Sequence, residues 1–296
     1  MGVLDGQAAV VTGGGRGIGR GHCLHLAREG ATVVVNDIDR KEADDVVEEI
    51  HQAGGQAVSD THDISTREGA RALIGHCVDE FGAIHAVVNN AGNVRDRSFL
   101  KMTDEEFMAV VQVHQQGTFM CSQEGALRMK AQGSGGSIVN TVSAAHFGNF
   151  GQTNYAGSKG AIASMTYTWA LELARAGIRV NAISPTGSTR MSSTYKGPDG
   201  KDVELPFMDP TQNGAFVAYL CSDAARWISG QVFGTGNNRV SVLEQPRYGH
   251  TVHMDGGWTV DRLSEKFESY FKASMEPIGL MKAPYPFLDG IHPPEK

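Results

Sequence analysis

A glycine-rich segment near the N-terminus constrains the fold of this chain more than any other feature. It reads Thr12-Gly13-Gly14-Gly15-Arg16-Gly17-Ile18-Gly19 and connects a short apolar run at residues 8–12 to an amphipathic stretch at 18–29. Glycines let the backbone turn sharply and approach a bound group, and the helix that follows presents free N–H groups. Because the strand, turn and helix occur in the required order, the segment predicts a site for the pyrophosphate of a dinucleotide. The expected contacts come from Gly13, Gly15, Arg16, Gly17, Ile18 and Gly19.

The rest of the chain alternates short apolar runs with longer amphipathic stretches. Further strands are expected at residues 32–36, 56–62, 86–89, 137–141 and 179–184. Helices are expected at residues 40–53, after residue 65, from residue 103 to about 120 and at 154–176, with capping boxes at Ser65 with Glu68 and at Thr103 with Glu106. This alternation predicts an α/β fold, a single doubly wound Rossmann-type parallel sheet with helices on both faces and strand order 3-2-1-4-5-6-7.

A length of 296 residues suits one open α/β sheet, so we expect one dinucleotide-binding catalytic domain over residues 1–260. The periodic pattern lapses at residues 188–211, and an irregular segment of that length is typical of a lid over a binding site. Residues 261–296 are expected to be an extended tail of the same domain, because five of the ten prolines fall in its last twenty residues.

Charge and composition exclude several functional classes. A formal net charge of -7 lacks the basic footprint of a nucleic-acid-binding protein. The four cysteines form no CxxC pair, and His250 with His253 lacks a third ligand nearby, so no metal site is expected. No apolar stretch is long enough to span a bilayer and no signal peptide is visible, so we expect a cytoplasmic protein with reduced thiols.

Asp37 closes the second expected strand, about twenty residues after the glycine segment. A carboxylate at that position accepts hydrogen bonds from the adenosine ribose hydroxyls and repels a 2′-phosphate. The cofactor is therefore predicted to be NAD rather than NADP, although Arg16 and Arg40 could soften the repulsion.

Tyr155 and Lys159 lie four positions apart at the start of a predicted helix, so both project from one face. Ser143 ends the fifth strand, and the carboxyl ends of parallel strands face the ligand crevice. Removing a hydroxyl proton while hydride leaves an alcohol carbon needs a base. A tyrosine pKa near 7 instead of about 10 asks for roughly 4 kcal/mol, which a cation about 4 Å away supplies at an effective dielectric of about 20. Lys159 is the expected cation, and Ser143 would orient the substrate oxygen.

These residues resemble the short-chain dehydrogenase/reductase family over nearly the whole chain. The resemblance rests on the glycine segment, on Ser143, Tyr155 and Lys159, on Asn89-Asn90-Ala91-Gly92 and on His62-Asp63-Ile64. It implies catalytic roles for the serine, tyrosine and lysine, and relatives that are generally homodimers or homotetramers. The cofactor contacts that it implies beyond the glycine segment are Asp63, Ile64, Asn90, Ala91, Gly92, Tyr155, Lys159, Pro185, Gly187 and Ser188.

One position departs from the family pattern. His114 stands where the family usually has the asparagine that anchors a water relay to the lysine, and it is taken as a fourth catalytic candidate, with a packed helix histidine as the alternative. This histidine and the segments at 148–155, 184–191 and 256–258 are similar to the (3R)-hydroxyacyl-CoA dehydrogenase units of peroxisomal-type multifunctional enzymes and to hydroxysteroid dehydrogenase-like bacterial relatives.

The leading hypothesis is an NAD-dependent oxidoreductase that oxidises a secondary alcohol to a ketone. The resemblance favours a 3-hydroxyacyl-CoA or a hydroxysteroid-like lipid, and apolar residues of the expected lid would contact it: Met191, Tyr195, Leu205, Phe207 and Met208. The alternatives are an NADPH-using 3-ketoacyl reductase, which Asp37 disfavours, and a non-catalytic dinucleotide-sensing regulator, which the presence of Tyr155 and Lys159 disfavours. His146, three residues after Ser143, is either a pocket residue or a loop histidine without a role.

Overall fold

The computed structural model describes residues 2–189, 207–236, 238–276 and 278–279. Its centre is an eight-stranded sheet with the order β3-β2-β1-β4-β5-β6-β7-β8. Neighbouring strands are parallel except that β8 runs antiparallel to β7. The predicted doubly wound sheet and its order 3-2-1-4-5-6-7 are confirmed, and β8 is an addition at the edge. The strands are β1 Ala8–Thr12, β2 Thr32–Asn36, β3 Gln56–Asp60, β4 Ala86–Asn89, β5 Gly136–Thr141, β6 Ile178–Pro185, β7 Val232–Gly236 and β8 Arg239–Val242.

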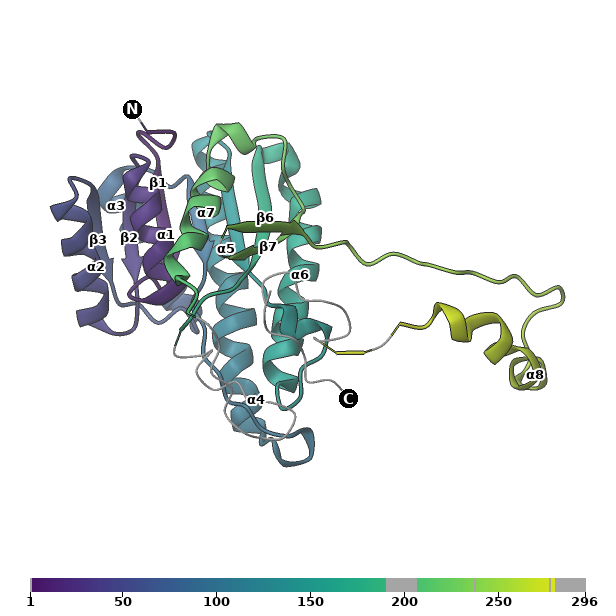
Figure 1. Ribbon diagram of the computed structural model, residues 1–296. Coiled ribbons are helices and arrows are strands. Elements are labelled where there is room, and N and C mark those ends of the chain that lie inside the picture. Colours follow the sequence, from purple (N-terminus) through teal and green to yellow (C-terminus); the bar gives the residue numbers. More distant parts are fainter. Residues whose placement is uncertain (1, 190–206, 237, 277, 280–296) are drawn as a thin grey trace.

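Helices cover both faces of the sheet (Figure 1). One face carries α1 Gly17–Arg28, α2 Arg40–Gln52 and α7 Asn213–Cys221, and the other carries α3 Arg67–Phe81, α4 Asp104–Val111, α5 Gly117–Gln132 and α6 Thr153–Leu173. Successive residues of one strand serve opposite cores, since Val33 and Val35 pack on the first face and Val34 on the second. Continuous apolar strands are the pattern of a sheet buried on both sides.

Two local predictions need correction. Helix α3 is capped by Thr66, whose hydroxyl accepts from the Gly69 N–H at 3.0 Å, and not by a box of Ser65 with Glu68. The reason is that the Asp63 carboxylate takes the Ser65 N–H at 2.9 Å and moves the helix start by one residue. Strand β3 also ends at Asp60, two residues earlier than predicted, because the His62 N–H turns back to the Asp60 carboxylate.

The predicted capping box of α4 is confirmed. The Glu106 carboxylate accepts from the Thr103 N–H at 3.1 Å, and the Thr103 hydroxyl accepts from the Glu106 N–H at 3.2 Å. The helix runs further than predicted. A π-helical turn, Gln112–Gln116, connects α4 to α5, which ends at Gln132. Such turns widen a helix locally and often occur at functional sites, and this one contains His114.

The predicted extended tail is wrong for its first part. Residues 260–271 form helix α8, Val260–Phe271, capped by the Thr259 hydroxyl. Apolar residues recur at helical spacing there, at Leu263, Phe267 and Phe271, while the prolines that indicated an extended chain begin only at residue 277. Residues 243–259 carry α8 away from the sheet (Figure 1), and most of the proline-rich end lies outside the described residues.

The two ends of the predicted lid are joined at its base. Ser188 donates its N–H to the Met208 carbonyl at 2.7 Å, and its hydroxyl accepts from the Met208 N–H at 2.9 Å. The predicted lid residues Met191, Tyr195 and Leu205 lie outside the described part of the chain. Phe207 and Met208 are described, and Met208 is buried while Phe207 is exposed.

Candidate active site

The glycine segment leaves no room for a side chain at several of its positions. Gly13 and Gly17 have left-handed backbones, with φ of 62° and 54°. A Cβ on Gly13 would lie 2.7 Å from the Cα of Ala91, and one on Gly19 would lie 2.0 Å from the Gly13 carbonyl oxygen. In α1, which is described throughout, the N-cap residue Arg16 gives no side-chain cap and the first turn holds no acidic residue. This helix start therefore fits an anionic pyrophosphate.

The end of β4 is fastened to the glycine segment. Asn90 donates its side-chain amide to the carbonyls of Thr12 and Gly13, at 3.1 and 2.9 Å. In return, the Thr12 hydroxyl accepts from the N–H groups of Asn90 and Ala91 at 3.0 and 3.1 Å. The structure thus brings the predicted residues Asn90 and Ala91 against the start of the glycine segment.

Asp37 directly follows β2, and the residue is only 6% exposed. Its two oxygens accept from the N–H groups of Gly15 and Asp39, both at 3.1 Å. The two nearby arginines are engaged elsewhere: Arg16 reaches both Glu42 oxygens at 2.6 Å, and Arg40 reaches the hydroxyls of Ser59 and Thr61. A 2′-phosphate beside Asp37 would meet a carboxylate whose expected counter-charges are already bonded to other groups.

The remaining predicted cofactor residues lie at the ends of β3 and β6. Asp63 is exposed in the turn after β3, and the neighbouring Ile64 is buried. Pro185 ends β6. Gly187 follows it so closely under the chain at Pro210 that a Cβ would lie 2.7 Å from the Pro210 Cα. All of these positions belong to the carboxyl edge of the sheet, where ligands of doubly wound folds bind.

Lys159 is held in the floor of the candidate site. Its side chain, which α6 projects toward β5, is 3% exposed, and its ammonium donates to the carbonyl oxygen of Thr141 at 2.6 Å. The same nitrogen lies 5.6 Å from the ring centroid of Tyr155. Ser143 follows the same strand, where its hydroxyl accepts from the Ala145 N–H at 3.2 Å and interacts with Tyr155. The three predicted catalytic side chains therefore meet at one place.

Burial is the largest influence on the pKa values of Tyr155 and Lys159. It raises the pKa of Tyr155, an effect that the hydrogen bond with Ser143 opposes and the charge of Asp96 reinforces. Burial lowers the pKa of Lys159 to about 7. The expectation of a Tyr155 pKa near 7 combined Lys159 with the positive charge of an oxidised nicotinamide, and it stays a prediction, since burial is the largest influence on Tyr155 among the groups of this chain.

His114 lies in the π-helical turn, 1% exposed. Its Nε2 is 2.8 Å from the Asn93 carbonyl oxygen and 3.0 Å from the Asn93 nitrogen, while Nδ1 has no partner among the described residues. Its ring faces Tyr155 edge-on. Burial, and next the charge of Lys159, lower the pKa of His114 to about 3, so the ring is neutral at physiological pH.

Sequence reasoning did not single out Asn154, which holds the first turn of α6 in place. It is fully buried, donates its side-chain amide to the carbonyls of Arg95 and Glu106, both at 3.0 Å, and accepts from the Tyr155 N–H at 2.8 Å. A polar residue directly before the tyrosine was the only signal, and its partners come from distant segments.

Three further histidines singled out in the sequence lie at described positions. His146 bonds through Nδ1 to the Ser143 carbonyl, beside the site, and burial lowers its pKa. His250 packs edge-on against Phe271, and His253 lies 3.5 Å from the carboxylate of Asp255. Within the described ranges, no group of three or more histidine, cysteine, aspartate or glutamate side chains could hold a metal ion, and none of the helices there is long and apolar enough to cross a membrane.

The profile of the short chain dehydrogenase family matches residues 7–197, and the chain belongs to that family. The hydroxyacyl-CoA dehydrogenase ChsB1 of Mycobacterium tuberculosis is 39% identical over 284 residues, which cover 90% of this chain and 89% of that protein. The peroxisomal hydratase-dehydrogenase-epimerase of Saccharomyces cerevisiae is 41% identical over 240 residues, 79% of this chain but 26% of the yeast protein.

Solved structures agree with this assignment. A short chain dehydrogenase from Mycobacterium avium superposes with a TM-score of 0.83 at 34% identity, covering 94% of this chain and 98% of its own. A 7α-hydroxysteroid dehydrogenase in complex with NADH and 7-oxo glycochenodeoxycholic acid gives a TM-score of 0.69 at 32% identity, covering 79% and 94%. The predicted resemblance to hydroxyacyl-CoA and hydroxysteroid dehydrogenases is thereby confirmed.

Proposed function

We propose that this oxidoreductase uses NAD to oxidise a secondary alcohol to a ketone. The observation that carries the proposal is the meeting of Tyr155, Lys159 and Ser143 at the carboxyl edge of the sheet, on the side of the glycine loop. A regulator without turnover would have no need to bury a lysine against the tyrosine of a dinucleotide site.

The side chains divide the proton chemistry between them. Tyr155 would take the proton of the substrate hydroxyl, Ser143 would hold the substrate oxygen in line, and Lys159 would stabilise the phenolate. Bound NAD would accept hydride from the carbinol carbon and bring positive charge to the site. Because burial alone keeps the Tyr155 pKa high, the residues of this chain need such added charge to act as a base near neutral pH.

His114 is proposed as the fourth member of the site. Its unpartnered Nδ1 and its position beside Tyr155 suit a group that holds a water molecule near Lys159. A ring pKa of about 3 means that it would act as a neutral hydrogen-bonding group and not as an acid. The alternative of a packed helix histidine predicts that its polar atoms do not matter for the rate.

The preference for NAD rests on Asp37. Its buried carboxylate and the engagement of Arg16 and Arg40 with other groups support discrimination against a 2′-phosphate. The complex of the similar hydroxysteroid dehydrogenase with NADH agrees with this choice.

The substrate is proposed to be a 3-hydroxyacyl-CoA or a hydroxysteroid-like lipid. The name of the mycobacterial relative supports the first and the bile-acid complex supports the second. In the described part of the lid, Phe207 offers an exposed apolar side chain next to the buried Met208. A spectrophotometric screen of NAD reduction over hydroxyacyl-CoAs, hydroxysteroids and simple secondary alcohols tests the proposal, and no activity on any of them would refute it.

A second candidate is the reverse reaction, a 3-ketoacyl reductase that uses NADPH. The raised pKa of Tyr155 favours it, because a protonated tyrosine is the acid that carbonyl reduction needs. Asp37 disfavours NADPH. Rates measured in both directions with both cofactors at one pH separate the two candidates.

We further propose a cytoplasmic homodimer or homotetramer. Apolar side chains are exposed on α4, α5 and α6, most strongly Leu127 and Leu171, and these helices flank the strands around which relatives associate. All four cysteines are free and buried, which suits a reducing compartment. Light scattering on the purified chain with and without Leu171→Glu measures the assembly.

A further inference from the structure

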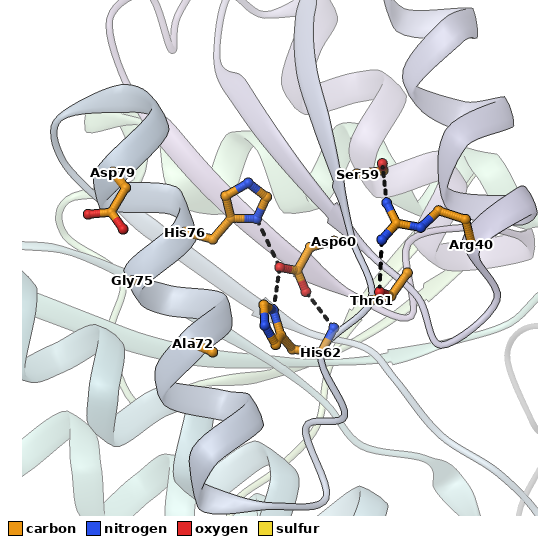
Figure 2. A pocket seen from close by; sticks show the side chains of 9 residues that line it. All are labelled: Arg40, Ser59, Asp60, Thr61, His62, Ala72, Gly75, His76 and Asp79. Atoms are coloured by element: carbon orange, nitrogen blue, oxygen red, sulfur yellow. Dashed lines mark hydrogen bonds and ion pairs between the residues drawn. The ribbon is translucent and has the colours of Figure 1, made fainter.

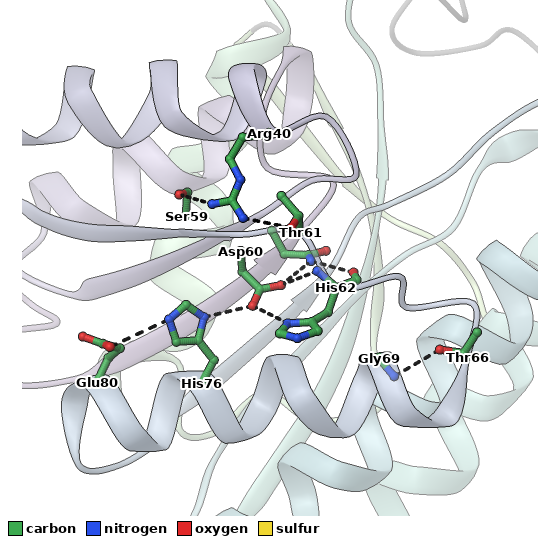
Figure 3. Close-up of polar contacts among 10 residues, drawn as sticks. Arg40, Ser59, Asp60, Thr61, His62, Thr66, Gly69, His76 and Glu80 are labelled. Carbon is green, nitrogen blue, oxygen red and sulfur yellow. Dashed lines mark hydrogen bonds and ion pairs between the residues drawn. The ribbon is translucent and has the colours of Figure 1, made fainter.

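A buried carboxylate that the reaction does not use lies at the end of β3. Asp60 is 2% exposed and accepts four hydrogen bonds. One oxygen accepts from the Asn36 amide at 2.8 Å and from the His62 N–H at 2.9 Å. The other accepts from Nδ1 of His62 at 2.8 Å and from Nδ1 of His76 at 2.9 Å. Figure 3 shows the two imidazoles converging on this one side chain from the turn after β3 and from α3.

The Asp60 carboxylate is ionised in the folded chain at neutral pH. Burial alone would raise the pKa of Asp60, but the hydrogen bonds from the His62 side chain and backbone, from Asn36 and from His76 outweigh it and leave the pKa below its usual value. A buried charge whose acceptor positions are filled is held in one geometry, while the loss of its charge would weaken all four bonds together.

Three of the four bonds to Asp60 come from the segments expected to carry the adenosine contacts. Asn36 directly precedes Asp37, and its amide also reaches the His62 carbonyl at 3.0 Å. The Asp37 N–H donates to the Asp60 carbonyl at 3.0 Å. His62 directly precedes Asp63 and Ile64. Together with these bonds, the side chain of Asp60 therefore joins the end of β2 to the turn after β3.

We propose that Asp60 is a positioning residue for the adenosine half of the dinucleotide. It sets the distance between Asp37, on the ribose side, and the Asp63–Ile64 turn, on the adenine side, without touching the cofactor itself. The inference rests on the proposed function, because it assumes that the carboxyl edge binds a dinucleotide.

The surroundings of Asp60 argue against two other roles. Both imidazoles turn Nδ1 to the same carboxylate oxygen, as donors do, and the described residues contain no group of histidine, cysteine, aspartate or glutamate side chains that could hold a metal ion. A cavity of about 710 Å³ opens beside them, and the two carboxylates in its lining, Asp60 and Asp79, work against an anion site. Figure 2 shows Asp79 on α3, away from Asp60 and without a contact to it.

The test compares Asp60→Asn with Asp79→Asn in the full chain. Asparagine keeps the shape and removes the charge, and Asp79→Asn removes a carboxylate from the same cavity without touching the network. Calorimetry with ADP-ribose, which has the adenosine half but no nicotinamide, measures positioning directly. We expect Asp60→Asn to raise the Kd for ADP-ribose and the KM for NAD by about tenfold, with kcat within about twofold of wild type and Asp79→Asn unchanged.

The outcomes separate the two proposals. If wild type binds ADP-ribose and folded Asp60→Asn binds it as tightly, the positioning role is overturned while the dinucleotide site stands. If wild type does not bind ADP-ribose, the proposed function itself fails. A kcat that falls with an unchanged KM indicates a loss of folded protein and overturns the positioning role. If Asp60→Asn does not fold, the same measurements on His76→Phe test the positioning role. This variant removes one hydrogen-bond donor to Asp60, from a side chain that is only partly buried.

Discussion

His114 stands edge-on to Tyr155, with ring centroids 5.2 Å apart and an angle of 89° between the planes. The other side of the histidine faces Gly92, where a Cβ would lie 2.2 Å from Cε1 of the imidazole. Because Gly92 has no side chain, it leaves the space that the His114 ring occupies. The residues that positions 92 and 114 can hold therefore depend on each other.

The first prediction follows from that dependence. Gly92→Ala should lower the free energy of unfolding by about 1–3 kcal/mol, the usual effect of overpacking. In the double variant Gly92→Ala/His114→Ala, the new methyl group enters the space of the ring, so the two effects should not add. Urea unfolding of the four proteins of the cycle measures the coupling. Gly75→Ala, in a helix where a Cβ meets nothing within 4 Å, is the control and should not destabilise. Additive effects at 92 and 114 would contradict the packing.

The second prediction concerns the base. Tyr155→Phe removes the proton acceptor and should lower kcat by about 10²-fold or more, as expected for loss of a general acid–base group. NAD binding should stay nearly intact, because the glycine loop and Asp37 are untouched. Turnover with the best substrate of the screen and NAD titration calorimetry check both halves. Tyr167→Phe, on the same helix, serves as the matched control. More than about a tenth of the wild-type rate in Tyr155→Phe would sink the mechanism.

The third prediction uses the buried lysine. The pKa of Lys159 falls from its unfolded value of 10.5 to about 7, so the unfolded chain binds more protons between these two values. Stability contributed by this group therefore rises as the pH increases from 7 toward 10.5, and the penalty for burying the charge is complete below 7. Its size is of the order of a few kcal/mol at most.

Urea unfolding of wild type and Lys159→Met at pH 6.5 and 9.5 measures this effect. The free energy of unfolding of Lys159→Met, relative to that of wild type, should be higher at pH 6.5 than at pH 9.5. The hydrogen bond to Thr141 is lost at both pH values, and the dependence of its strength on the charge of the lysine already contributes to the pKa of the folded chain. Lys130→Met, at an exposed lysine of α5, should show no such change, and an equal difference for Lys159→Met at both pH values would contradict the burial of a titrating charge.

Sequence patterns were sufficient for the architecture because the sheet depends on short-range signals. Residues 32–36 and 86–89 are strands with the bounds expected from their apolar runs, and the order of the strands follows from the β–α alternation. Helix α8 was missed because the prolines after residue 276 suggested an extended segment, although the apolar spacing of Leu263, Phe267 and Phe271 was present.

The site was predictable only where motif spacing carries it. Ser143, Tyr155 and Lys159 are read directly from the sequence. The direction in which the Tyr155 pKa shifts could not be predicted from the sequence, because it depends on how far the fold removes water from the phenol ring. Asp60 likewise gave no signal, since its partners Asn36 and His76 are distant in sequence and meet only when β2, β3 and α3 pack together.

The final prediction tests the choice of cofactor. Asp37→Asn removes the charge expected to face a 2′-phosphate and keeps only one of the two acceptor oxygens that receive the Gly15 and Asp39 N–H groups. The ratio of kcat/KM with NADP to that with NAD should rise by about tenfold or more, which corresponds to a loss of roughly 1.4 kcal/mol of repulsion. Steady-state rates with both cofactors at low ionic strength measure it, since screening weakens the effect in salt. Asp44→Asn removes an exposed charge from α2, the helix that follows Asp37, and should leave the ratio of the two kcat/KM values unchanged. If Asp37→Asn also leaves the ratio unchanged, discrimination does not reside in this carboxylate, and the NADPH-using reductase becomes the better description.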